Sequence, residues 1–115
     1  MLSRPHRFHG YGSLRYVYRN GKVVRGAFCS LKYVANSRNT RYRVAVVVSK
    51  KVSKSAVVRN RIRRRMYEIV RTVVVVDQPV DLVFTVYNEQ MATMAADQLK
   101  DCMLTQLESA QIQLK

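Results

Sequence analysis

Hydrophobic and polar positions recur with two different periods along this chain, and each change of period marks an element. The segment 13–20 places Leu14, Val17 and Tyr18 at the i, i+3, i+4 spacing of a helix, and its first residue, Ser13, suits an N-cap. A glycine follows the segment directly, as is common past a helix C-terminus. The pattern predicts a short first helix.

Four segments are predicted to be strands, because β-branched and aromatic residues recur in them at every second position or in short apolar runs. They are residues 22–25, 27–35, 41–49 and 81–87. The third has the strictest alternation, which places four residues on one face, Tyr42, Val44, Val46 and Val48. It follows a polar turn at 36–40, so we interpret it as one half of a hairpin.

Two longer helices are predicted from a period of 3.6 residues. The first spans about residues 55–74, ends before the sequence DQP at 77–79, and gathers its apolar positions on one side: Val58, Ile62, Met66, Ile69, Val70 and Val73. The second spans about residues 92–114 and has an apolar stripe formed by Ala92, Ala95, Leu99, Cys102, Met103, Leu107 and Ala110.

The order helix, three strands, helix, strand, helix predicts an α+β fold, a two-layer α-β sandwich in which the helices lie against one mixed sheet. The 115 residues suffice for one core, so residues 1–115 are expected to form a single domain. The chain has no apolar run of the roughly 18–20 residues that a membrane helix needs and no signal-like apolar start. We therefore expect a cytoplasmic protein.

Neither a metal site nor a redox role is expected from the cysteines. Cys29 and Cys102 are far apart in sequence, and only His6 and His9 could complete a zinc quartet with them. Cys29 falls in a predicted strand and Cys102 on a predicted apolar stripe, where a free cysteine acts as a small buried hydrophobe.

Charge divides the chain into two parts. Residues 1–76 carry 19 Lys and Arg against one acid, a net charge of +18, whereas residues 77–115 carry two against six, a net charge of −4. The total of +14 implies an anionic partner, and its concentration in the first two thirds of the chain indicates a binding surface there.

The polar side of the helix predicted at 55–74 carries much of this excess: Asn60, Arg61, Arg64, Arg65 and Arg71. Such a face is often only a solvated surface, but a single acid, Glu68, is available to pair here, with Arg64 or Arg65. Arginines also occupy the first turns, where the helix dipole disfavours each cation by about 0.3–1 kcal/mol. Stability does not explain this pattern, whereas phosphate binding by guanidinium groups does.

The basic segment is predicted to bind structured RNA. Strands precede the basic helix, whereas a helix-turn-helix protein has another helix there, so DNA is not the expected partner. Aromatic residues interleaved with cations in the first half suggest a second site, for extended RNA. The aromatic residues, each of which could also be a core residue, are Tyr11, Tyr16, Tyr18, Phe28, Tyr33 and Tyr42, and the interleaved cations are Arg15, Arg19, Lys32, Arg41 and Arg43.

The run RVAVVVSKKVSKSAVVRNRIRRRMYEIVR, residues 43–71, resembles the signature of the protein subunit of bacterial ribonuclease P. In that family a valine-rich strand ends in a Ser-Lys-Lys turn and leads into a helix that bears Arg-Asn-Arg. The matching positions are Ser49, Lys50, Lys51, Arg59, Asn60, Arg61, Arg63 and Arg64. The resemblance implies a ribosomal-protein-like sandwich with a left-handed βαβ crossover, an exception to the usual right-handed rule.

The resemblance also implies a function. A protein of this family binds the catalytic RNA of ribonuclease P and the 5′ leader of precursor tRNA, and the RNA performs the cleavage with Mg²⁺ that it mainly holds itself. For this chain we expect no catalytic residue, no protein-bound metal, no organic cofactor and no membrane partner. The implied catalytic-RNA-binding residues are Lys50, Lys51, Lys54, Arg59, Asn60, Arg61, Arg63, Arg64 and Arg65, and the implied leader cleft contains Leu14, Tyr18, Phe28, Lys32, Tyr33, Arg41 and Arg43.

Two departures from the family pattern affect that cleft. The family has two aromatics separated by three residues near the first helix, and the equivalent residues here are Leu14 and Tyr18. After the last strand the family keeps one or two basic residues, whereas this chain has VYNEQ at 86–90. We expect leader contacts to be built differently at both places.

Two other functions stay open from the sequence. A structural RNA-binding module, such as a ribosomal protein with this sandwich, would have the same charge and no role in tRNA maturation. A stand-alone nuclease would need a nucleophile with a base, or paired carboxylates, and the basic region offers neither.

Overall fold

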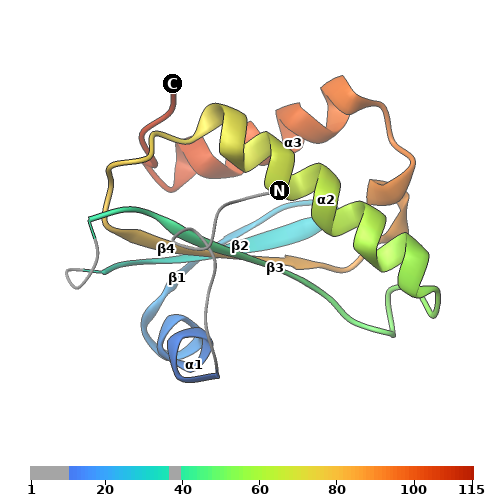
Figure 1. The fold of residues 1–115 in the computed structure, drawn as a ribbon, viewed down its shortest axis with the longest axis horizontal. Coiled ribbons are helices and arrows are strands. Elements are labelled where there is room, and N and C mark those ends of the chain that lie inside the picture. Colours follow the sequence, from blue (N-terminus) through green and yellow to red (C-terminus); the bar gives the residue numbers. More distant parts are fainter. Residues whose placement is uncertain (1–10, 37–39) are drawn as a thin grey trace.

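A mixed four-stranded sheet forms the middle layer of the molecule, in the strand order β1-β2-β4-β3 (Figure 1). The computed structural model describes residues 11–36 and 40–115, so His6, His9 and the middle of the predicted turn at 36–40 lie outside the described residues. The strands are β1 Lys22–Arg25, β2 Cys29–Ala35, β3 Arg43–Val48 and β4 Val80–Val86. The helices are α1 Tyr11–Asn20, α2 Ala56–Val73, the short 3-10 helix η2 Glu89–Ala92 and α3 Ala96–Ser109.

Helices lie on both faces of this sheet. Figure 1 shows α2 and α3 over one face and α1 against the other. The predicted element order and the sandwich of helices on a mixed sheet are confirmed, and α1 adds a helix on the opposite face.

Strand β4 occupies the centre of the sheet. It pairs antiparallel with β2 and parallel with β3, and its residues 81–84 are all buried. The predicted hairpin that included the 41–49 strand is therefore wrong, because β4 separates β3 from β2 and the hairpin is formed by β1 and β2. The physical reason is that β4 is apolar on both faces, and only a central strand is covered on both faces.

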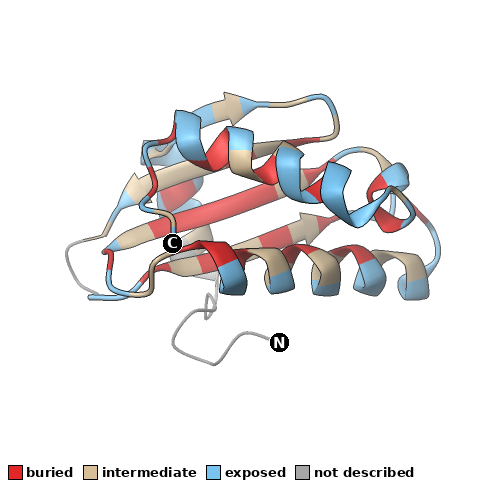
Figure 2. Cartoon of the chain, turned by 90° about the horizontal axis from the view of Figure 1, so that it is seen from above, coloured by how far each residue is buried: buried red, intermediate tan, exposed pale blue. Residues whose placement is uncertain are grey.

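Strands β3 and β4 are parallel neighbours joined through α2, so the three form a βαβ unit. In the two ribbon views α2 returns over the face that α3 also covers, and the sense of the crossover is left-handed (Figure 1, Figure 2). This is the uncommon hand that the family resemblance implied.

The main hydrophobic core lies between the sheet and the two helices α2 and α3 (Figure 2). The alternation predicted for β3 is confirmed, because its buried residues all lie on one face, Val44, Val46 and Val48, with Tyr42 buried just before them. The apolar side predicted for α2 is also confirmed in its buried residues, Ile62, Met66, Val70 and Val73. Val58 and Ile69 are partly buried and pack against the same core.

Helix α1 is fixed to the other face of the sheet at its centre. Val17 of α1 and Val83 of β4 are both fully buried and lie outside the main core cluster. The helix begins at Tyr11, so Ser13 lies within it and is not its N-cap. It ends at Gly21, where an added Cβ would lie 2.5 Å from the Val17 carbonyl oxygen, so this close approach requires glycine.

The C-terminal helix is shorter than the predicted span of 92–114. The chain forms η2 first and starts α3 only after Ala95, which has an extended backbone and is exposed. The helix ends before Gln111, whose φ of 59° is left-handed. The last residues then lie along the segment after α2, with a bridge between Leu114 and Val74. The predicted stripe is buried at Leu99, Met103, Leu107 and Ala110, and half-buried at Cys102.

Candidate RNA interface

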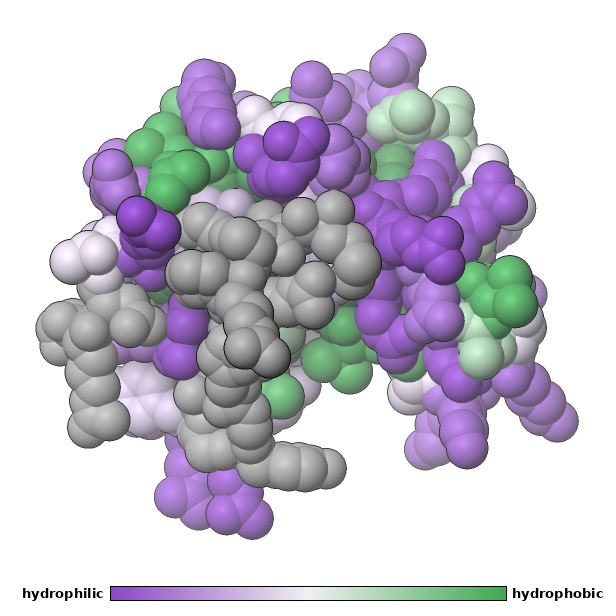
Figure 3. All heavy atoms as spheres, in the orientation of Figure 1, coloured by the Kyte–Doolittle hydropathy of each residue, from purple (hydrophilic) through white to green (hydrophobic). Residues whose placement is uncertain are grey.

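Helix α2 carries an exposed cationic surface on the side that faces away from the core. It consists of Lys50, Lys51 and Lys54 in the connection from β3 and of Asn60, Arg61 and Arg64 on the helix, and we call these six residues the basic face. Figure 3 shows strongly hydrophilic residues gathered over α2 in the view of Figure 1. The first turn of α2 contains no acid, although a negative charge there would stabilise the helix by interacting with its dipole.

Two further arginines of the predicted set fasten the helix start to the preceding connection. Arg59 donates from Nη1 to the Ser53 carbonyl at 2.9 Å, and Arg63 donates from Nη2 to the Val48 carbonyl at 3.3 Å. Arg63 also donates to the side-chain oxygen of Asn60 at 2.8 Å. Both side chains are half-buried, so they orient the connection that carries the lysines and keep donors for an anion.

The N-terminus of α2 is formed by a local serine pair. The Ser55 hydroxyl accepts a hydrogen bond from the Val58 amide at 3.2 Å, and the buried Ser53 hydroxyl accepts one from the Ser55 amide at 3.3 Å. Next to the cap, Val57 is 77% exposed in the midst of the cations. A fixed cap gives the basic face a defined geometry before any partner binds.

Arg65, for which the resemblance implies an RNA contact, is engaged in hydrogen bonds within the fold. Its guanidinium donates to the Met91 carbonyl at 2.7 Å and to the Met94 carbonyl, so it joins α2 to η2 and the turn after it. Burial lowers the pKa of Arg65, and the charge of Arg61 adds to this effect. The periodicity placed Arg65 on the polar side of the helix, but η2 covers that position.

Glu68 pairs with Arg71 and not with Arg64 or Arg65. Arg71 donates from Nε to the Glu68 carboxylate at 3.1 Å and makes a second, shorter contact with it through Nη2. This hydrogen bond lowers the pKa of Glu68 and raises that of Arg71. Because Glu68 is engaged with the residue one turn onward, Arg61 and Arg64 have no acidic partner among the described residues.

A groove of about 300 Å³ lies on the opposite side of the sheet, beside α1. Seven residues line it, and we call it the α1 groove: Tyr18, Val23, Arg25, Ser30, Lys32, Thr85 and Tyr87. Lys32 donates to the Tyr18 carbonyl at 2.7 Å, and its ammonium lies 5.3 Å from the centre of the Tyr18 ring. Tyr18 and Lys32 are the two members of the predicted leader cleft that the structure places in this groove.

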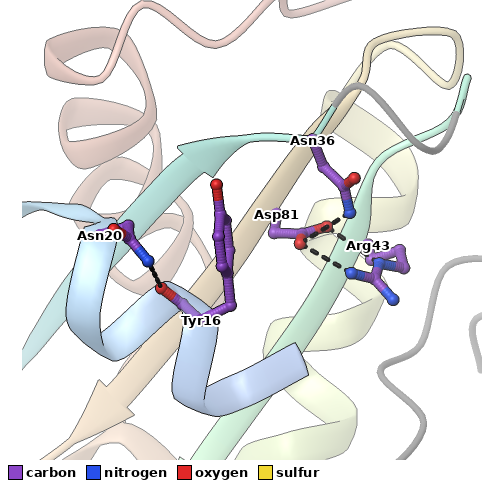
Figure 4. A network of polar contacts seen from close by, with 5 residues as sticks. All are labelled: Tyr16, Asn20, Asn36, Arg43 and Asp81. Carbon is purple, nitrogen blue, oxygen red and sulfur yellow. Dashed lines mark hydrogen bonds and ion pairs between the residues drawn. The ribbon is translucent and has the colours of Figure 1, made fainter. Parts of the chain in front are cut away.

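Three other members of the predicted cleft lie elsewhere around α1 and β3. Leu14 is half-buried on α1, and Arg41 is exposed just before β3. Arg43 lies on the α1 side of the sheet, where it forms a two-pronged ion pair with the buried carboxylate of Asp81 at 2.9 and 2.8 Å (Figure 4). Asn36 donates to the same carboxylate at 2.9 Å, so this cation is part of the support of the sheet.

The remaining predicted aromatics lie on the side of the sheet that α2 and α3 cover. Tyr33 shares a face with Leu31 and packs against the main core, so the structure places it outside the α1 groove. Phe28 also packs against that core, and Tyr42, suggested for the extended-RNA site, is only 1% exposed. In contrast Tyr16 and Tyr18 on α1 are 53% and 42% exposed.

Five groove residues were not predicted from the sequence: Val23, Arg25, Ser30, Thr85 and Tyr87. Their neighbourhood follows from strand register, because Ser30 pairs with Arg25 on one side and with Thr85 on the other. Ser30 and Lys32 are two residues apart in a predicted strand, so the sequence could have indicated that both lie on the same face of β2. The contact with β4 could not be read from local periodicity.

The described residues contain no group of three or more His, Cys, Asp or Glu side chains that could hold a metal ion. Cys29 is buried and donates its thiol to the Gln106 side-chain oxygen at 3.2 Å. No helix in the part of the chain that the structure describes is long and apolar enough to cross a membrane.

The sequence matches the family model of Ribonuclease P over residues 2–111. It is 42% identical over 71 residues to a ribonuclease P protein component of Pseudanabaena sp. (strain PCC 6903), an alignment that covers 62% of this chain and 61% of the relative. It is 53% identical over 53 residues to the ribonuclease P protein component of Thermus scotoductus, covering 46% of this chain and 30% of the relative. The aligned part of the chain therefore spans less than two thirds of the length of these relatives.

The fold is similar to that of solved RNase P proteins. The RNase P protein of Staphylococcus aureus superposes with a TM-score of 0.79 and 20% identity, covering 93% of this chain and 96% of that chain. The RNase P protein of Thermotoga maritima superposes with a TM-score of 0.71 and 17% identity, covering 84% and 89%. At these identities the similarity concerns the fold.

Proposed function

The chain belongs to the ribonuclease P protein family, and from this premise we propose that it is the protein subunit of a bacterial ribonuclease P that acts in the cytoplasm. In this role it binds the catalytic RNA through the basic face of α2 and the 5′ leader of precursor tRNA through the α1 groove. The observation that carries the proposal is the location of these two surfaces on opposite sides of one sheet.

The basic face supplies the affinity for the catalytic RNA. Lys50, Lys51 and Lys54 reach phosphates as point charges, whereas Arg61 and Arg64 present planar forks that bind phosphate through two hydrogen bonds. Asn60 adds a polar group between the cations. Because like charges crowd this surface without acidic neighbours, bringing RNA phosphates to it relieves repulsion and releases counterions.

The α1 groove supplies contacts to an unpaired strand. Single-stranded RNA is held by aromatic rings that stack on bases and by cations that follow the phosphates, and the groove offers both in Tyr18 and Lys32. With α2 on the far side of the sheet, one protein molecule contacts two RNAs at once. The protein thereby lowers the repulsion between the catalytic RNA and its substrate.

We assign the hydrolysis of the phosphodiester bond to the RNA subunit. Mg²⁺ bound mainly by that RNA supplies the activation of water and the stabilisation of the leaving oxygen. The described side chains of this protein contribute binding and orientation of the leader, and we assign no proton transfer to any of them. The family match favours this function over that of a structural RNA-binding module such as a ribosomal protein.

Cleavage of a precursor tRNA by the organism's ribonuclease P RNA, with and without this protein at low Mg²⁺, tests the proposal. We expect a large gain in cleavage with the protein, and we expect the gain to shrink when the leader is shortened to one nucleotide. Tight RNA binding without any gain would instead favour the structural module. Cleavage by the protein alone, free of RNA, would overturn the assignment of the chemistry to the RNA.

A further inference from the structure

The α1 groove has a second wall that the proposed function does not explain, at the end formed by β1 and β4. Tyr18 and Lys32 stand on the α1 side, and Arg25 and Tyr87 stand at the other end. Ser30 and Thr85, which are direct cross-strand partners, form the floor between them. No acid is among the seven lining residues, so the groove favours an anion.

Tyr87 is tethered at two points and yet half exposed. Its amide donates to the Phe28 carbonyl at 3.1 Å, and its hydroxyl donates to the Gly26 carbonyl in the turn between β1 and β2. The residue nevertheless keeps 49% of its surface exposed. A ring held in place before binding loses little conformational entropy when a base stacks on it.

The turn that anchors the Tyr87 hydroxyl is itself held from the other side of the sheet. The Gly26 amide donates to the Cys29 carbonyl at 2.9 Å, and the Gln106 side chain of α3 donates to the Cys29 carbonyl at 2.9 Å and the Val24 carbonyl at 3.2 Å. A Cβ on Gly26 would lie 2.9 Å from the Gln106 amide nitrogen, so the turn packs tightly against α3. The position of Tyr87 is therefore fixed by buried contacts.

The two cations of the groove differ in how they are engaged. Lys32 already donates to the Tyr18 carbonyl and lies over the Tyr18 ring. Arg25 is exposed at the end of β1, and its side chain makes no hydrogen bond or ion pair within residues 11–36 and 40–115. Arg25 can thus give its full fork to a phosphate without breaking an existing contact.

We propose that Tyr87 and Arg25 form a subsite for one unpaired leader nucleotide, whose base stacks on the Tyr87 ring and whose phosphate contacts Arg25. The groove volume of about 300 Å³ lies at the lower end of the range of small-ligand sites. The hydroxyls of Ser30 and Thr85 lie on the floor of the same groove, where they can hydrogen-bond a base edge. This inference rests on the proposed function, because it assigns the leader to the α1 groove.

The test is binding of precursor tRNA to the assembled holoenzyme, with leaders of full length and of one nucleotide. Tyr87→Leu should weaken binding of the full-length leader between about 5-fold and about 150-fold, the range of base–aromatic stacking, and leave the one-nucleotide leader unaffected. Tyr87→Phe keeps the ring and should stay within about 2-fold of the native protein. Arg25→Gln should weaken binding and make its salt slope shallower by about 0.7.

Tyr16→Leu is the matched control, since Tyr16 is an exposed tyrosine of α1 that does not line the groove. Abasic substitution of the leader, one nucleotide at a time, should reveal a single position whose loss is harmful to the native protein and harmless to Tyr87→Leu. The thermal unfolding temperature of each variant shows whether weaker binding reflects a lost RNA contact or a less stable protein. Arg25 is exposed, so Arg25→Gln tests the subsite with little expected effect on stability.

The outcomes separate the two proposals. If Tyr18→Leu and Lys32→Gln weaken leader binding but Tyr87→Leu and Arg25→Gln do not, the subsite is wrong and the leader groove stands. If none of the four variants changes leader-dependent binding while the holoenzyme still assembles, the leader does not occupy this groove, and both assignments fail.

Discussion

The arginines of α2 fall into separate groups according to what their guanidinium groups contact. Arg61 and Arg64 are exposed, Arg59 and Arg63 donate to carbonyls of the preceding connection, and Arg65 donates to carbonyls around η2. Their side chains are identical, so sequence alone gives them one role. The hydrogen bonds separate them, because Arg59, Arg63 and Arg65 contact backbone carbonyls, and only Arg65 connects α2 to a distant element, η2.

This difference between Arg65 and Arg64 can be measured. Arg65→Ala should lower the free energy of unfolding by about 1.5–3 kcal/mol, because it removes charge-assisted hydrogen bonds to two carbonyls. Arg64→Ala should change it by less than about 0.5 kcal/mol and instead weaken RNA binding. Urea denaturation and RNA titration of both variants check this. Equal stability of the two variants would contradict the structural role of Arg65.

The buried thiol of Cys29 makes the free energy of unfolding depend on pH in the alkaline range. Burial raises the pKa of Cys29 to about 12, with the nearby Cys102 adding to the effect. A thiol with a higher pKa in the folded chain keeps its proton there, so its contribution to stability is complete below the unfolded pKa and is lost as the pH rises toward the folded pKa. Burial likewise raises the pKa of Tyr42.

We therefore expect the free energy of unfolding to fall above about pH 9, by at most about 1.4 kcal/mol per pH unit for the Cys29 proton. Cys29→Ala should show a shallower fall over the same range, although it is less stable at neutral pH because a buried methyl-sized volume is lost. Chemical denaturation at several pH values between about 8 and 10 measures both slopes. Parallel slopes for the two proteins would exclude this thiol as the cause.

Among the elements, β4 connects the two sides of the molecule. Its residues on one face join the main core, and Val83 on the other face is buried under α1. At its start, Asp81 accepts hydrogen bonds from Arg43 of β3 and Asn36 after β2. One buried carboxylate thus ties together three neighbouring strand ends.

Removing the Asp81 carboxylate should lower the free energy of unfolding more than removing one partner of a surface ion pair would. Asp81→Asn should lower the free energy of unfolding by about 3 kcal/mol, because it leaves the guanidinium of Arg43, whose side chain is only 17% exposed, without its carboxylate. Arg43→Gln should lower the free energy of unfolding less in the Asp81→Asn variant than in the native protein, since the ion pair is already broken in that variant. Additive effects of the two changes in denaturation would show that the residues are not coupled.

At the scale of the whole molecule, charge and scaffold are separated along the chain. The first 76 residues carry a net charge of +18 and contain the basic face and five of the seven residues of the α1 groove, whereas the last 39 carry a net charge of −4 and supply β4, η2 and α3. Among the described residues no acid forms an ion pair with a cation of the basic face, so acids do not compete with phosphates for these cations.

This separation predicts a steep salt dependence of binding to the catalytic RNA. If six to ten phosphates are neutralised, the slope of log K against log salt should be about −5 to −9. Arg61→Ala and Arg64→Ala should each make the slope shallower by about 1, whereas Tyr16→Leu should leave it unchanged. A titration series over salt concentration measures these slopes. A flat response would exclude phosphate binding by the basic face.

The sequence by itself determined the order of the longer helices and of the strands, the apolar sides of α2 and β3, the position of the cations and the resemblance to the family. These features are local, because a period of 2 or 3.6 residues and a run of arginines can be read without knowing what lies next to them. The helix predicted at 55–74 and the strand predicted at 41–49 agree with α2 and β3 for this reason.

Tertiary structure decided which of those residues meet. The insertion of β4 between β2 and β3 places Thr85 beside Ser30 and Tyr87 beside the β1–β2 turn, and Tyr33 lies on the side of the sheet that α2 and α3 cover. The packing of η2 on α2 brings the carbonyls of Met91 and Met94 to Arg65, a contact that the run of arginines does not indicate. Such pairings depend on strand order and on the free energy of burying whole faces, which no short window of sequence contains.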